Sequence, residues 1–143
     1  MVEPERHPMA AELIAAVGEV MLRWGRLEAE MMRRLEGSEH NLSPRAPTIQ
    51  LWRVVSGQSG SDLAVWNEEI EWAAHVRNLL AHGFVGGVCE PIDGHPAVIC
   101  RHPDGEHRRL THDTLKVAAE RLDLLQLRLR QETDALRRSP RKI

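Results

Sequence analysis

The sequence contains only two cysteines, Cys89 and Cys100, among its 143 residues. Two thiols are too few for the disulfide framework that stabilises many small secreted domains. The chain also lacks any apolar run of the about eighteen residues that a membrane-spanning helix needs. Its first residues, MVEPERHPMA, are charged and contain prolines, whereas a secretion signal would begin with a basic segment followed by an apolar one. We therefore expect a cytoplasmic protein with reduced thiols.

A strong overall charge is also missing, because the formal net charge is −2. The charge is uneven, since residues 1–100 carry 8 basic and 14 acidic side chains and residues 101–143 carry 11 and 7. The chain as a whole is not attracted to nucleic acid, so an anionic partner must be bound locally. The basic tail at residues 139–143 is typical of a solvated chain end, with a binding arm as the alternative.

Metal-binding spacing is absent as well. The second half of the chain holds several potential ligands, namely Cys89, His95, Cys100, His102, His107 and His112. They form no Cys-x-x-Cys or His-x-x-x-His pair, which is the spacing that zinc sites commonly use. We therefore expect no metal site and no other cofactor.

The first part of the chain has the periodicity of a long amphipathic helix from Ala10 to Glu36, followed by a helix-ending Gly37. Its apolar residues recur at spacings of three and four: Leu13, Val17, Val20, Met21, Trp24, Leu27, Met31 and Leu35.

Two shorter helices are expected next. One runs from about Pro47 to Val55 and ends at Gly57. The other begins with a cap at Ser61 or Asp62 and ends at Gly83. Its apolar stripe is Leu63, Trp66, Ile70, Ala73, Val76 and Leu80.

Residues 84–110 have no helical period and contain two Asp-Gly turn signals, at Asp93-Gly94 and Asp104-Gly105. Short β-like runs occupy residues 84–89, 97–101 and 107–110. We expect a small antiparallel hairpin or a three-stranded meander.

A last long helix is capped by Thr111 or Asp113 and runs to about Arg138. Its inward residues are expected to be Leu115, Ala118, Ala119, Leu122, Leu125, Leu129 and Leu136. The sequence thus predicts a mainly α fold, a bundle of four to five helices with the β-hairpin or meander inserted before the last one. One domain spans residues 1–143, with an arm at 1–9, the insertion at 84–110 and the tail at 139–143. Val65 and Leu127 lie off the apolar stripes and, if exposed, would help to form a second apolar face for self-association.

The stretch HVRNLLAHG carries three polar residues of chemical interest, Arg77, Asn78 and His82. Histidine moves protons near neutral pH, and the arginine fork binds phosphate. Asn78 can orient a phosphate, a ribose hydroxyl or the histidine ring. This set suits cleavage of RNA by its own 2′-hydroxyl, with histidine as base or acid and arginine stabilising the charged phosphorane.

In an ideal helix, Arg77 and His82 do not lie side by side. Arg77 precedes His82 by five residues, which places the two about 140° apart around an ideal helix. Two arrangements would bring them together. The long arginine can reach around the helix end at Gly83, or a second chain can supply the partner residue across a two-fold axis.

The stretch RNLLAH, from Arg77 to His82, resembles the R-x4-6-H motif of the HEPN domain family, including the polar residue after the arginine. The order of elements is also similar, with a long first helix containing RWGRLEAEMM and the motif at the end of a later helix. The residues at 84–110 match nothing in that pattern. The resemblance implies a HEPN-like helical bundle, and a homodimer with both motifs at its interface.

The resemblance further implies a metal-independent ribonuclease, serving as a toxin, a defence effector or an RNA-processing factor. Arg77 and His82 would then be the catalytic pair and Asn78 their supporting residue. A toxin of this kind is silenced by an antitoxin or regulatory protein. The alternative is a non-catalytic HEPN-like module that binds nucleotides, RNA or another protein.

A purely structural interpretation also exists. Arg77 can pair with Glu71 or Glu69, and His82 can cap the last carbonyls of its helix. His75 can assist at the site, although a bond to Glu71 is the simpler expectation. Arg108 and Arg109, with the last-helix arginines Arg121, Arg128 and Arg130, can guide RNA, although a solvated surface is the default. The four tryptophans are expected to pack in the core or at an interface, and base stacking is their alternative role.

Overall fold

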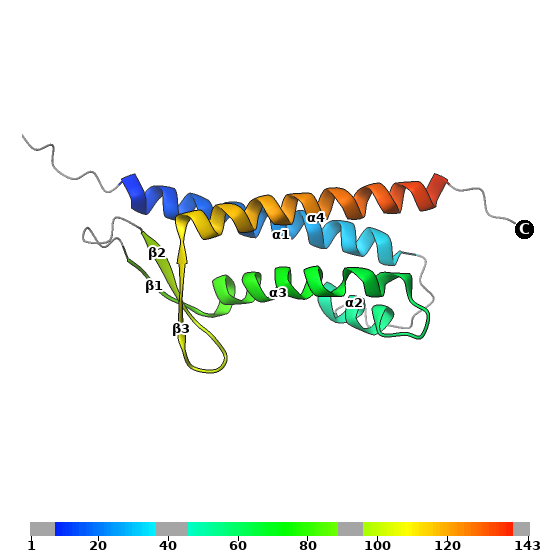
Figure 1. Ribbon diagram of the computed structural model, residues 1–143, viewed down its shortest axis with the longest axis horizontal. Coiled ribbons are helices and arrows are strands. Elements are labelled where there is room, and N and C mark those ends of the chain that lie inside the picture. The colour runs from blue at the N-terminus through cyan, green and yellow to red at the C-terminus, as the bar shows by residue number, and fades with distance from the viewer. Residues whose placement is uncertain (1–7, 37–45, 89–95, 139–143) are drawn as a thin grey trace, which may run out of the picture.

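The computed structural model describes residues 8–36, 46–88 and 96–138. Along the chain lie α1 (Pro8–Leu35), α2 (Thr48–Ser56), a short 3-10 helix η1 (Asp62–Trp66), α3 (Asn67–His82), β1 (Phe84–Val88), β2 (Ala97–Arg101), β3 (His107–Thr111) and α4 (His112–Arg138). The expected mainly α fold, with a small antiparallel sheet before the last long helix, is confirmed (Figure 1).

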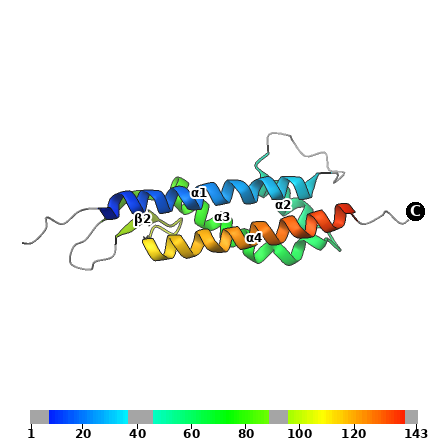
Figure 2. The same ribbon diagram turned by 90° about the horizontal axis from the view of Figure 1, so that it is seen from above.

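The two long helices, α1 and α4, lie side by side and run in the same direction, while α3 lies below them and runs back (Figures 1 and 2). The predicted stripes form the contact between them, because residues spaced by three and four share one face of a helix. The core includes Val20, Leu27 and Met31 of α1, Ile70 and Ala73 of α3, and Leu115, Leu122, Leu125 and Leu129 of α4. The sheet closes one end of this bundle, and α2 lies toward the other end (Figure 1).

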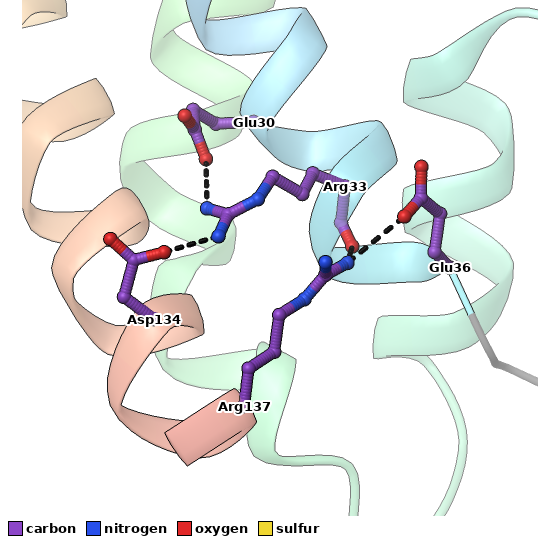
Figure 3. Close-up of polar contacts among 5 residues, drawn as sticks. All are labelled: Glu30, Arg33, Glu36, Asp134 and Arg137. Carbon is purple, nitrogen blue, oxygen red and sulfur yellow. Dashed lines mark hydrogen bonds and ion pairs between the residues drawn. The ribbon is translucent and has the colours of Figure 1, made fainter.

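Ion pairs fix the register of α1 against α4. Arg23 pairs with Asp123, and Arg33, ten residues further along α1, pairs with Asp134, eleven residues further along α4. Figure 3 shows the second of these pairs, in which Arg33 also contacts Glu30 at 3.2 Å. The hydrogen bond from Arg33 lowers the pKa of the Asp134 carboxyl. The two spacings differ by a single residue, as expected for two helices that run side by side in the same direction.

At the end of α1, Arg137 of α4 joins the two helices again. Its Nη2 donates to the carbonyl of Arg33 and to the carboxylate of Glu36, both at 2.9 Å (Figure 3). The carbonyl of Arg33 belongs to the last turn of α1, where carbonyls lack partners within the helix. This arginine therefore satisfies a group that the helix itself leaves open.

The short helix α2 is attached to α3 by two side chains. Trp52 is buried, and its Nε1 donates to Asn67 Oδ1 at 3.1 Å. Arg53 forms a two-pronged pair with Glu71, with N···O distances of 2.6 and 2.8 Å. The pair lowers the pKa of Glu71, chiefly through the hydrogen bond from Arg53.

Both predicted caps are present. The hydroxyl of Ser61 accepts from the backbone N–H of Leu63 at 3.2 Å, and that of Thr111 accepts from the N–H of Thr114 at 3.1 Å. The third helix differs from the expected continuous one, because its first residues form the 3-10 helix η1 and α3 begins at Asn67.

The three strands pair in the order β1-β2-β3, both pairs antiparallel, which confirms the meander. Register between β1 and β2 shifts from Phe84 to Gly86, a local bulge. Gly105 in the β2–β3 turn has a φ of +91°, a conformation that favours glycine.

Cys100 of β2 is a free, buried thiol, and burial raises its pKa. Gly37, Cys89 and the Asp93-Gly94 turn lie outside the described residues.

Some individual predictions are corrected or confirmed by burial. Leu136 was expected to face inward but is 47% exposed, and the core position in that turn belongs to Thr133. Val65 and Leu127 are exposed, as their positions off the stripes indicated. The tryptophans pack as core residues: Trp24, Trp52 and Trp66 are buried, and Trp72 is half-buried against the hydrophobic core. Within the described residues, no helix has the length and apolar character needed to cross a membrane.

Candidate functional site

The third helix ends where the chain turns into the sheet (Figure 1). The N–H of Gly83 bonds to the carbonyl of Leu79 at 3.0 Å, and its carbonyl accepts from the N–H of Arg101 on β2 at 2.6 Å. A Cβ atom at this position would lie 2.6 Å from the Arg101 carbonyl oxygen. Glycine is therefore required here by the close approach of two backbones, while its φ of −96° is ordinary.

Arg77, Asn78 and His82 come together within one chain. Arg77 Nη1 lies 3.1 Å from Asn78 Oδ1 and 3.1 Å from His82 Nε2. Of the two arrangements expected from the sequence, the reach of the arginine along the helix end is the one observed. Contact between Arg77 and His82 does not need a second chain.

The contact with Arg77 determines which ring nitrogen of His82 carries the proton when the ring is neutral. An arginine nitrogen donates and cannot accept, so a bond from Nη1 to His82 Nε2 uses the lone pair of that nitrogen. A neutral His82 then carries its proton on Nδ1. The Nε atom of Arg77 is buried without a partner among the described residues.

Beside this pair lies a hollow of about 870 Å³ between the end of α3 and the β2–β3 turn. We call it the motif groove. Three histidines line it, His75, His82 and His102, together with Asn78 and Arg101. Arg77 does not line the groove itself but holds the two motif residues that do.

His102 follows β2 and faces His75 of α3. Their ring centroids lie 5.2 Å apart in an edge-to-face arrangement. His102 Nδ1 lies 3.0 Å from a carboxylate oxygen of Asp104. The pKa of Asp104 is lowered, mainly by the hydrogen bond from the backbone N–H of Glu106 and also by His102. The carboxylate is therefore held in its charged form beside the imidazole.

The ion pairs expected for a purely structural motif differ from the observed ones. Glu71 pairs with Arg53, and Glu69 lies 3.5 Å from Arg128. Neither carboxylate contacts Arg77. The expected bond between His75 and Glu71 was also wrong, because Glu71 is occupied by Arg53 and His75 contacts His102.

The weaker candidates Arg108 and Arg109 lie on β3 and line a second hollow, which adjoins the motif groove; neither arginine lines the groove itself. Arg108 also lies 3.5 Å from Asp104 and 3.8 Å from Glu106. The structure thus brings Arg77, Asn78, His82 and His75 to one place and puts the two β3 arginines beside it.

His102 and Asp104 were missed as site residues by the sequence reasoning. The available signal was the Asp104-Gly105 turn, which brings the end of β2 back over the end of α3. From the sequence alone, His102 was considered only as a potential zinc ligand. In the described parts of the chain, no group of three histidine, cysteine or acidic residues is arranged to hold a metal ion.

Comparisons with models of known families, with curated proteins and with solved structures found no match to this chain. The fold places the chain in the class of small helical bundles, here closed at one end by a three-stranded sheet. Assignment to the HEPN family stays a prediction based on the motif.

Proposed function

We propose that the chain is a metal-independent endoribonuclease of HEPN type. The observation that carries this proposal is the contact of Arg77 Nη1 with His82 Nε2 at the edge of the motif groove. A cation beside a proton-transfer group, next to a hollow large enough for a nucleotide, is what cleavage of a phosphodiester requires.

The first step transfers a proton from the ribose 2′-hydroxyl to His82 Nε2. In the absence of substrate this lone pair is engaged by Arg77. A bound phosphate attracts the guanidinium more strongly than a neutral imidazole does, because it offers two charged acceptor oxygens. When Arg77 turns to the phosphate, Nε2 is released to act as the base.

In the second step the 2′-oxygen bonds to phosphorus and the bond from phosphorus to the 5′-oxygen breaks. The products are a 2′,3′-cyclic phosphate and a 5′-hydroxyl. The 5′-oxygen needs a proton, and His102 is the candidate donor, because it lines the same groove and lies 3.0 Å from the carboxylate of Asp104. Arg77 stabilises the charge of the phosphorane, and Asn78 orients the bound phosphate.

The biological role follows from the resemblance alone. We propose a toxin or defence effector that is controlled by an antitoxin or regulatory protein, and that acts as a homodimer in the cytoplasm. Since Arg77 and His82 meet within one chain, dimerisation would shape the substrate path and not assemble the pair. Sedimentation equilibrium of the purified protein tests the dimer directly.

The decisive experiment is incubation of the protein with mixed single-stranded RNA in the presence of EDTA. The wild type should cleave it, leaving ends that carry cyclic phosphate, and should leave a 2′-O-methyl RNA of the same sequence intact. His82→Ala and Arg77→Ala should each lose about a hundredfold in rate or more.

Two variants control for general effects of substitution. His107→Ala removes an exposed histidine from β3, and Arg26→Ala removes an exposed arginine from α1. Both should keep wild-type activity. The mechanism is refuted if all variants degrade RNA equally, which indicates a contaminant, or if the folded wild type cleaves none of the RNA.

A further inference from the structure

The second hollow, which we call the arginine hollow, lies between α3, β3 and the first turns of α4 and holds about 610 Å³. It shares two lining residues, His75 and Leu79, with the motif groove. The two hollows therefore adjoin along α3. An extended chain bound in the motif groove can continue directly into the arginine hollow.

The lining of the arginine hollow holds more arginines than carboxylates, although Arg108 also lies 3.5 Å from Asp104, which is not part of the lining. The lining contains Arg108, Arg109 and Arg121 but a single carboxylate, that of Asp113. This lining favours an anionic ligand, because attraction to phosphate depends on local clusters of cations.

A planar stack is built into the same hollow. The guanidinium carbon of Arg121 lies 3.8 Å from the ring centroid of Trp72. Trp72 is half-buried against the core, whereas Arg121 is exposed. In the described residues Arg121 has no carboxylate partner. A guanidinium held over an indole offers a flat charged surface on which a nucleobase can stack.

We propose that the arginine hollow binds the nucleotide adjoining the scissile phosphate of a single-stranded RNA. Its base stacks on Arg121 above Trp72, and its phosphate faces Arg108 and Arg109. An acidic peptide would satisfy the cations but leave the stack unused, so RNA is the better match. This inference rests on the proposed function for the position of the scissile phosphate.

Binding can be measured separately from cleavage. The full-length His82→Ala protein is titrated into a fluorescein-labelled heptameric RNA, and fluorescence anisotropy gives the dissociation constant. A series of the same RNA with one abasic residue at successive positions locates the stacked base. An abasic residue at a single position should weaken binding, by about tenfold, as expected for loss of one stacked base.

Arg121 variants then test the stack itself. Arg121→Ala in the same background should weaken binding of the intact RNA by about tenfold but leave binding of the sensitive abasic RNA unchanged. Arg121→Lys keeps the positive charge but lacks the planar guanidinium, so it should weaken binding as much as Arg121→Ala does. Arg26→Ala is the matched control and should leave binding unchanged, because Arg26 is an exposed arginine of α1 that lines neither hollow.

The phosphate contact has its own signature. Arg108→Ala should reduce the slope of log Kd against log salt concentration by about 0.7, the value for one phosphate contact on a single strand. A triglutamate peptide should not compete for the RNA at equal concentration.

The inference is overturned if the RNA does not bind or if the peptide competes as well as RNA. It is also overturned if Arg121→Ala weakens binding of the abasic RNA by the same factor as binding of the intact RNA.

These outcomes can be distinguished from the outcome of the cleavage experiment. Stacking at Arg121 without cleavage by the wild type rejects the catalytic proposal alone. Cleavage with no coupling between Arg121 and an abasic position rejects the arginine hollow alone.

Discussion

Arg77 Nη1 and His82 Nε2 lie 3.1 Å apart, although the two residues point about 140° away from each other on an ideal helix. The arginine side chain covers this angle because α3 ends at His82 and no further turn stands in its way. Asn78, the residue after the arginine, accepts a second bond from the same Nη1 atom. One guanidinium nitrogen therefore positions Asn78 and His82, the two motif residues that line the motif groove.

The first prediction concerns the tautomer of His82. Because Arg77 donates to Nε2, neutral His82 should carry its proton on Nδ1. Nitrogen-15 NMR of histidine-labelled protein above pH 8 should show this tautomer, and Arg77→Ala should change the signal toward the Nε2–H form. His107, exposed on β3, is the internal reference. A His82 signal that is the same in both proteins would mean that the contact is absent in solution.

The second prediction concerns Gly83. A methyl group there would lie 2.6 Å from the carbonyl oxygen of Arg101 and 2.8 Å from that of Leu79. Gly83→Ala should therefore reduce the free energy of unfolding by about 1–3 kcal/mol, as measured by urea denaturation, because both contacts are backbone. It should also displace the end of α3 from β2 and lower any activity of the motif.

Gly25→Ala is the matched control for that substitution. Gly25 lies in α1 with no atom within 4 Å of an added Cβ. Alanine there should raise the stability by about 0.5–1 kcal/mol, because glycine is unfavourable within a helix. Equal losses at both positions would show that the close approach at Gly83 is not the cause.

The helices and strands could be predicted from the sequence because each has a local signal. The apolar stripes determine which faces are buried, Ser61 and Thr111 act as caps, and the Asp104-Gly105 turn separates two strands. Leu136 continues the stripe but is exposed, because α1 ends at Leu35 and α4 extends past it with no other described helix over this turn (Figure 1).

The site was only partly predictable for a different reason. Helical angles place Cα atoms, but the contact of Arg77 with His82 depends on side-chain length and on where the helix ends. The approach of His102 to His75 depends on pairing between β2 and β3, which joins segments distant from α3 in sequence. Spacing within one segment carries no information on such a contact.

The third prediction tests the core. Leu27 of α1 is fully buried, so Leu27→Ala should reduce the free energy of unfolding by about 2–5 kcal/mol. Leu22, on the same helix, is 53% exposed, and Leu22→Ala should cost less than about 1 kcal/mol. Thermal or urea denaturation of the two variants compares equal chemical changes that differ only in burial. Similar losses would be inconsistent with the observed packing of α1.

The last prediction concerns pH and the attachment of α2 to α3. The hydrogen bonds from Arg53 lower the pKa of Glu71 below the value of 4.5 that it has when unperturbed. A carboxyl whose pKa is lower in the folded state contributes stability above its unfolded pKa, and this contribution disappears as the pH falls through the folded value. Because both side chains are about half exposed, the pair should contribute no more than about 1 kcal/mol. Urea denaturation should therefore show Glu71→Gln slightly less stable than the wild type at pH 7 and equal to it at about pH 2, where the wild-type carboxyl is protonated as well. A difference that stays constant over this range would mean that Glu71 acts through packing and not through its charge.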